Sequence, residues 1–305
     1  MKHEGADQGS RGTGLAGPQA ASPLPQERGE DAQRRRGVVT ALRHYLLALQ
    51  FFTRIPVTGR LADWVGFSPA MLRASAAHFP GVGWLVGALT AVVFGALLGL
   101  LPAQPAAPWV AAALCTVFSV LLTGAFHEDG LADLADGLGG SLERERALDI
   151  MKDSRIGSYG ALALVLAVLG KVALLALIAQ SAGLWPTVAV LFAAHVTSRF
   201  LPLVVIRSLA HVGDTAASKS KPLAASIGTG ALLAALLWWA LALALVVWVF
   251  PAAPWWQALL GALLGLAWMW RLLHRRLQGF TGDGLGAVQQ VGEVLFYLGF
   301  ALGLA

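Results

Sequence analysis

Long apolar runs are the feature that most constrains this chain. Seven stretches come close to the 20 or so apolar residues that a helix needs to cross a bilayer: 79–101, 107–126, 159–180, 184–206, 227–250, 255–272 and 288–305. Within lipid, only structures that pair all their backbone groups internally are stable, and for runs of this length that structure is the helix. Charged residues make up only 13% of the chain, against about 25% in soluble domains. We therefore expect an all-α, polytopic membrane protein with about seven transmembrane helices and short interfacial helices.

The connections between these runs alternate in charge. Three of them carry no charged residue, and the others hold the Lys and Arg clusters. Because basic loops stay in the cytoplasm, this pattern predicts a multi-pass protein of the cell inner membrane. It predicts that the N-terminus and the connections 127–158, 207–226 and 271–287 share the cytoplasmic face. The net charge of +5 fits this topology better than nucleic-acid binding, so we expect a lipid bilayer as partner and no nucleic acid.

The N-terminal part differs from the rest of the chain. Residues 1–36 are rich in Gly, Pro, Gln and charge without an apolar period, which predicts a disordered tail. Residues 37–305 are expected to form a single integral-membrane catalytic domain, beginning with an amphipathic interfacial helix over 38–56. The one cysteine, Cys115, excludes an intramolecular disulfide and a cysteine-based metal site.

Residues 127–153 contain eight of the eleven carboxylates that follow Asp63. In a helix, the first aspartates of this segment stand at i, i+4 and i+7 on one face, and the last two repeat the i, i+4 spacing: Asp129, Asp133, Asp136, then Asp149 and Asp153. Gly137, Gly139 and Gly140 permit a tight turn between two such helices. Converging carboxylates describe a site for one or two hard cations such as Mg²⁺. The alternative is a solvated acidic face neutralised by Arg144, Arg146, Lys152 and Arg155.

Other polar residues stand at positions where chemistry is plausible. Arg54 could meet a phosphate or act as a snorkelling anchor, and Arg199, two turns inside the fourth run, is interpreted as a phosphate contact. Lys171 lies near the middle of the third run, where a structural salt bridge is expected, and His195 is expected to be a packed, hydrogen-bonded residue. Asp283 could join the metal cluster, accept a proton or act as a helix N-cap.

Four segments together resemble the cobalamin synthase family (adenosylcobinamide-GDP ribazoletransferase, or cobalamin-5'-phosphate synthase). They are FFTRIPV at 51–57, FHEDGLADLADGLGG at 126–140, MKDSRIGSYG at 151–160 and TGDGLGA at 281–287. The acidic segment is also loosely similar to the signature of CDP-alcohol phosphotransferases, whose four acids hold two metal ions. Asp133, Asp136 and Gly137 match its first half, while the gap before Asp149 and Asp153 is shorter.

The resemblance implies a Mg²⁺-dependent phosphotransferase. It would transfer the adenosylcobinamide-phosphate group from adenosylcobinamide-GDP to alpha-ribazole, or its 5'-phosphate, with release of GMP. The expected metal ligands are Glu128, Asp129, Asp133, Asp136 and Asp153, and the expected catalytic residues are Asp133, Asp136, Asp149 and Asp153. Substrate contacts are expected from Arg54, Lys152, Arg155, Arg199, Asp283 and Gln290.

Three alternatives and two questions of assembly stay open at this stage. Another membrane phosphotransferase of the CDP-alcohol type would use the same acids. A cation transporter would use them as its binding site, although transporter sites lie near the bilayer midplane. A membrane scaffold without chemistry would not explain so many acids in one segment. A homo-oligomer and a complex with other cobalamin-pathway enzymes are both compatible with the sequence.

Overall fold

The computed structural model describes residues 25–213 and 226–305, and every regular element in them is a helix. The chain divides into two compact units, Met1–Ala41 and Leu42–Ala305. Helix α1 (Pro25–Phe52) begins inside the segment expected to be a tail and continues into the interfacial helix expected at 38–56. Residues 1–24 of that tail, and residues 214–225 of the 207–226 connection, lie outside the described residues.

The helices of the second unit confirm a multi-pass membrane protein. Six are long and apolar enough to cross a membrane, and a bent pair brings the total to as many as seven. The six are α4 (Phe79–Leu100), α8 (Ser158–Ala182), α9 (Leu184–Ser208), α11 (Thr229–Val249), α12 (Trp255–Arg276) and α13 (Gly282–Leu302). Short helices α2 (Arg60–Val65), α3 (Pro69–Ser75) and η1 (Ala76–His78) precede α4, and α7 (Arg144–Met151) precedes α8.

The second expected span is not one straight helix. Helix α5 (Ala107–Thr123) ends early, and α6 (Phe126–Gly140) follows at an angle of 90°. Gly124 and Ala125 both have left-handed backbone conformations, with φ of 66° and 59°, which ends α5 and redirects the chain. The backbone N–H of Arg54 donates to the carbonyl of Leu122 (2.7 Å), and the Arg54 guanidinium packs against Gly124. Arg54, which precedes Gly124 by 70 residues, therefore packs against this bend.

Helix α6 also continues further than the glycines suggested. Gly137, Gly139 and Gly140 form its last turn instead of a separate turn, and α7 begins at Arg144. A Cβ at Gly137 would lie 2.8 Å from the carbonyl oxygen of Ala147, so α7 packs directly on the backbone of α6 at this position. Here the missing side chain serves a close helix contact, a role that local sequence does not distinguish from a turn.

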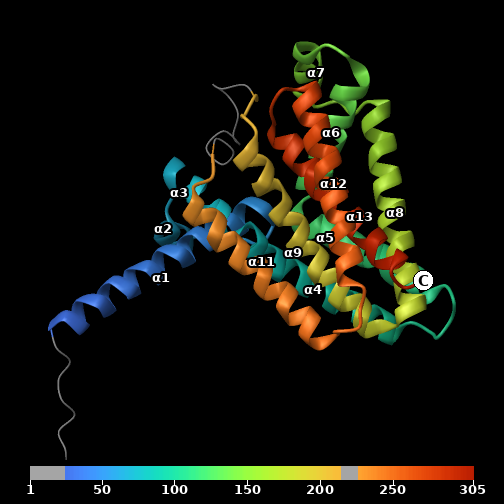
Figure 1. Cartoon of the computed structure of the whole chain (residues 1–305), viewed down its shortest axis with the longest axis horizontal. Coiled ribbons are helices and arrows are strands. Elements are labelled where there is room, and N and C mark those ends of the chain that lie inside the picture. The colour runs from blue at the N-terminus through green and yellow to red at the C-terminus, as the bar shows by residue number, and fades with distance from the viewer. Residues whose placement is uncertain (1–24, 214–225) are drawn as a thin grey trace, which may run out of the picture. The chain divides into compact units, whose positions relative to one another are not determined.

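Helix α13 is the centre of the membrane unit. It packs against α12, α6, α9 and α8, as Figure 1 shows. Helix α9 packs against α13 and also contacts α4 and α11. In the most apolar stretch of 18 residues of each helix, 83% is buried by the rest of the protein in α9 and 67% in α13. Polar groups in the middle of these two helices, such as His195, Arg199 and Glu293, are therefore shielded by protein from both lipid and water.

The connections predicted to share one face do gather at one end of the helices. The Arg276 guanidinium donates to the carbonyls of Leu138 (3.1 Å) and Ser141 (2.6 Å), and Arg144 Nε donates to the Leu277 carbonyl (2.7 Å). A single bridge joins His211 to Phe280. At the uncharged end, Gln180 donates to the Pro105 carbonyl (3.0 Å). The basic loops thus meet at the end that also carries α7.

Candidate active site

The site begins where α6 crosses the first turn of α13. A Cβ at Gly130 would lie 2.8 Å from the Asp283 carbonyl oxygen and 3.0 Å from its Cα. Gly286 makes the matching approach from α13, where a Cβ would lie 3.1 Å from the His127 carbonyl oxygen. Only glycine permits two helix backbones to come this close. The crossing therefore fixes Asp283 between the positions of Asp129 and Asp133 along α6.

Three carboxylates meet at this crossing. Asp133 interacts electrostatically with Asp283 and Asp129, and Asp283 interacts with Asp129. In the described part of the chain, none of the three forms an ion pair with a basic residue. The N-cap interpretation of Asp283 is wrong, because Thr281 is the cap of α13 and its hydroxyl accepts the N–H of Gly284 (3.0 Å). Asp283 is free of that role and adds its charge to the α6 aspartates.

Glu128 directly precedes Asp129 on α6. Its Oε1 accepts a hydrogen bond from Gln290 Nε2 (2.9 Å) on α13. Its Oε2 is buried and has no hydrogen-bond partner among the described residues. A buried carboxylate oxygen without a partner is costly, and such atoms often mark the position of an ion or a ligand. Gln290 holds Glu128 in this structure, and its predicted substrate contact stays a prediction.

Asp136 has a different environment from the other aspartates of α6. It is 8% exposed, and its two oxygens accept the N–H groups of Gly157 (2.7 Å) and Gly160 (2.8 Å) at the start of α8. A carboxylate at a helix N-terminus satisfies free backbone donors and matches the positive end of the helix dipole. Asp136 thus ties α6 to α8, a structural role that the i, i+4, i+7 pattern did not reveal. Its predicted role as a metal ligand stays a prediction.

Asp149 of α7 and Asp153 of the following loop lie in a second place. Together with Asp136, they line a cleft of about 270 Å³ that also contains Arg146, Gly157 and Tyr159. Asp149 forms an exposed ion pair with Lys152 (3.3 Å). Hydrogen bonds from Arg155 to Asp153 lower the pKa of this carboxyl to about 2, so it is ionised at any physiological pH. Exposed pairs of this kind contribute little stability and can be exchanged for a bound phosphate.

The arginines predicted to contact phosphate also lie in different environments. Arg54 is exposed beside the bend between α5 and α6. Arg199 is 4% exposed, and its Nη1 donates to the His195 carbonyl (3.0 Å) and lies 3.1 Å from His195 Nδ1. Its guanidinium is turned into the protein and not towards the interface, although its Nε has no partner among the described residues. A phosphate contact by Arg199 stays a prediction.

The carboxylates do not all meet at one point. Within residues 25–213 and 226–305, no three His, Cys, Asp or Glu side chains stand in an arrangement that could hold a metal ion as they are. The residues nevertheless fit a hard cation in their chemistry. Asp129, Asp133 and Asp283 bring together three carboxyl groups without a basic partner among the described residues, and Glu128, the residue before Asp129, has a buried oxygen without a hydrogen bond. Carboxylate oxygens are the ligands that Mg²⁺ prefers.

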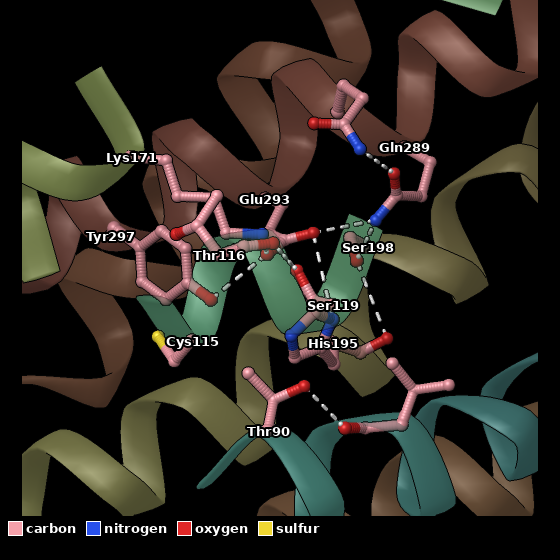
Figure 2. Close-up of polar contacts among 12 residues, drawn as sticks. Thr90, Cys115, Thr116, Ser119, Lys171, His195, Ser198, Gln289, Glu293 and Tyr297 are labelled. Carbon is pink, nitrogen blue, oxygen red and sulfur yellow. Dashed lines mark hydrogen bonds and ion pairs between the residues drawn. The ribbon is translucent and has the colours of Figure 1, made fainter. Parts of the chain in front are cut away.

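A buried polar network, which sequence reasoning missed, adjoins this site. Glu293 is 1% exposed and forms an ion pair with Lys171 (2.6 Å), which confirms a salt bridge for Lys171. Gln289 connects Glu293 to Ser198, and His195 lies against the same carboxylate, as Figure 2 shows. His195 is packed and hydrogen-bonded, as expected. The signal available in the sequence was the acid Glu293 inside one apolar run and the base Lys171 inside another, since such residues usually pair.

These features define a class of protein: a multi-pass membrane protein with a carboxylate-lined site at the end of the helices that carries its basic loops. The comparison with known sequences is consistent with this class and is more specific. The profile of the family described as Cobalamin-5-phosphate synthase matches residues 44–301. The chain belongs to this family.

Relatives with high identity cover most of the chain. A protein of Albidiferax ferrireducens is 63% identical over an alignment of 278 residues that covers 86% of this chain and 99% of the relative. A protein of Polaromonas sp. strain JS666 is 58% identical, covering 86% of this chain and 98% of its own. A protein of Vibrio cholerae is 43% identical, covering 83% and 91%. Each is named adenosylcobinamide-GDP ribazoletransferase. No solved structure gives a significant match.

Proposed function

We propose that this protein is an adenosylcobinamide-GDP ribazoletransferase that depends on Mg²⁺. A ribose hydroxyl of alpha-ribazole, or of its 5'-phosphate, attacks the cobinamide-side phosphorus of adenosylcobinamide-GDP. A new P–O bond forms, the bond to GMP breaks, and GMP leaves with the electron pair of that bond. The hydroxyl proton passes to a carboxylate of the site. The observation that carries the proposal is the cluster of unpaired carboxylates at the crossing of α6 and α13.

The residues divide the work of such a transfer. Phosphoryl transfers need positioning and charge neutralisation more than covalent chemistry. Asp129, Asp133 and Asp283, with Glu128, would hold Mg²⁺, which when bound supplies positive charge to the diphosphate. Arg155 and Lys152 line or border the second cleft and would exchange their aspartate partners for phosphate oxygens of the leaving group. Asp149 or Asp153 would then be released to act as the base.

The first test is release of GMP from adenosylcobinamide-GDP by purified protein in detergent or liposomes. We expect release only with alpha-ribazole, or its 5'-phosphate, and Mg²⁺ together. EDTA should abolish it and added Mg²⁺ should restore it, because the carboxylates alone repel the diphosphate. Turnover that persists in EDTA would contradict the metal assignment. Cation uptake by liposomes without any GMP release would favour the transporter alternative, to which the bent pair α5 and α6 gives some weight.

We further propose that the basic end, with the site, faces the cytoplasm of the inner membrane. The natural Cys115 is fully buried, so single cysteines introduced elsewhere give a clear signal. Cysteine at the exposed positions Gln104, Gly183 and Ala252 should react in intact cells with a thiol reagent that cannot cross the inner membrane. Cysteine at Leu142, which is 87% exposed, should react only after that membrane is opened. Equal labelling of Leu142 in intact cells would reverse the orientation.

A further inference from the structure

A continuous chain of hydrogen bonds runs from the interior of the helices to the acidic site. Gln290 Nε2 donates to Glu128 Oε1 (2.9 Å) and to Gln289 Oε1 (3.0 Å). Gln289 Nε2 in turn donates to Glu293 Oε2 (2.8 Å) and to Ser198 Oγ (2.9 Å). Both N–H protons of each amide are therefore donated in hydrogen bonds, and each hydrogen bond fixes the orientation of the next side chain in the chain. Figure 2 shows the inner part of this chain between Gln289 and Glu293.

Glu293 is anchored from both sides. Its Oε1 accepts from Lys171 Nζ (2.6 Å) on α8 and from the Tyr297 hydroxyl (3.1 Å). Lys171 is 4% exposed, and Tyr297 is fully buried. His195 Nδ1 lies 3.8 Å from Oε2, and the Arg199 guanidinium also interacts with this carboxylate. A buried ion pair contributes little to stability compared with well-packed apolar residues, so its presence here calls for another role.

We propose that Glu293, Gln289 and Gln290 are positioning residues that hold Glu128 as a pre-oriented oxygen ligand for the divalent cation. The proposal rests on the Mg²⁺ site of the proposed function. With Oε1 held by Gln290, the orientation of the Glu128 carboxylate is restricted, and Oε2 remains buried without a hydrogen-bond partner among the described residues. The hydrogen-bond partner of Oε1 is a neutral amide, and the cation that acts on the carboxylate is the buried guanidinium of Arg199, which leaves Oε2 without a hydrogen bond among the described residues. Loss of a hydrogen bond to a metal ligand commonly lowers metal affinity or activity about 10- to 100-fold.

The test measures binding of Mn²⁺, which accepts the same carboxylate ligands as Mg²⁺, by electron paramagnetic resonance of the full-length protein in detergent. The double variant Lys171→Met, Glu293→Leu replaces the ion pair by apolar side chains of similar size and should fold as well as the parent. It removes the acceptor for Gln289, so we expect Mn²⁺ affinity to fall about 10- to 100-fold. Gln290→Met, which removes the donor to Glu128, should cause a loss of the same size.

Two controls separate positioning from general stability. Lys171→Met, Glu293→Gln also removes both charges but keeps an acceptor for Gln289, so its Mn²⁺ affinity should be close to that of the parent. Gln180→Met removes an amide at the uncharged end and should change nothing at the site. In the variants that lose Mn²⁺ affinity, the melting temperature should stay near the parental value. The Mg²⁺ concentration for half-maximal GMP release should rise, while the KM for adenosylcobinamide-GDP at saturating Mg²⁺ should change little.

The outcomes distinguish this inference from the proposed function. Parental Mn²⁺ affinity in both Lys171→Met, Glu293→Leu and Gln290→Met would overturn the positioning role, whether or not GMP is released. Loss of affinity that follows the melting temperature in every variant would also overturn it, since that is the behaviour of a purely structural network. If the parent protein binds no Mn²⁺, there is no cation site for these residues to position, and the inference is overturned. Absence of GMP release with normal Mn²⁺ binding would contradict the proposed reaction and leave the positioning result standing.

Discussion

Asp133→Asn is expected to lower turnover about 100-fold or more at saturating Mg²⁺, because one charged ligand that stabilises the transition state is lost. Asp133 interacts with Asp283, Asp129 and Asp136 and has no basic partner in the described part of the chain. The substitution keeps the size of the side chain and its hydrogen-bonding capacity. Folding should survive or improve, since repulsion among like charges falls. The measurement is the initial rate of GMP release, together with the melting temperature.

Two comparison variants make this result specific. Asp63→Asn removes an exposed carboxylate on α2, outside the site, and should leave turnover and stability unchanged. Asp136→Asn should also reduce turnover but with a lower melting temperature, because the amide NH2 cannot accept a hydrogen bond and one of the two bonds to the start of α8 is lost. Parental activity in the double variant Asp133→Asn, Asp283→Asn would rule out a metal site at the crossing of α6 and α13.

Gly130→Ala should reduce turnover about 100-fold although no functional group is removed, since a displacement near 1 Å at a reacting site can cost that much. The new Cβ would meet the backbone of Asp283 at 2.8 Å from its carbonyl oxygen. A backbone atom of a packed helix cannot move aside as a flexible side chain can. The first turn of α13 must therefore shift, and with it the carboxylate of Asp283. Steady-state GMP release and Mn²⁺ affinity should both fall.

Gly170→Ala is the matched control for this substitution. Gly170 lies inside helix α8, and the nearest atom to a new Cβ is Val294 Cγ1 at 3.9 Å, which is ordinary contact. Alanine is favoured over glycine in a helix interior by about 0.5–1 kcal/mol, so this variant should be as stable as the parent or more so. Parental turnover in Gly130→Ala would show that the crossing is not needed for the reaction.

The membrane class, the approximate spans and the grouping of the basic connections could be predicted without a structure. Each depends on properties that add along the chain: hydropathy over about 20 residues and the count of Lys and Arg in each loop. The expected span 184–206 and the observed α9 (Leu184–Ser208) agree at one end and differ by two residues at the other. The four motifs likewise indicated the family to which the chain belongs.

The candidate site was predicted only in part. Helical periodicity correctly put Asp129, Asp133 and Asp136 on one helix, but it could not tell that Asp136 caps α8 while Asp133 faces Asp283. The glycines of α6 have the same local signature whether they form a turn or a close helix contact. Gly130 serves such a contact, with a residue 153 positions further along the chain. Periodicity defines a face of a helix and leaves its partner undetermined.

Hydropathy, charge and motif order already defined what kind of protein this is, because the free energy of transfer into lipid is a local property of each segment. Tertiary structure alone decided how its polar groups combine. The pairing of Lys171 with Glu293, and the link from Glu293 through Gln289 and Gln290 to Glu128, join residues from three helices. Such pairings depend on which helices pack together and at what angle, and that is set by side-chain complementarity between segments more than 100 residues apart.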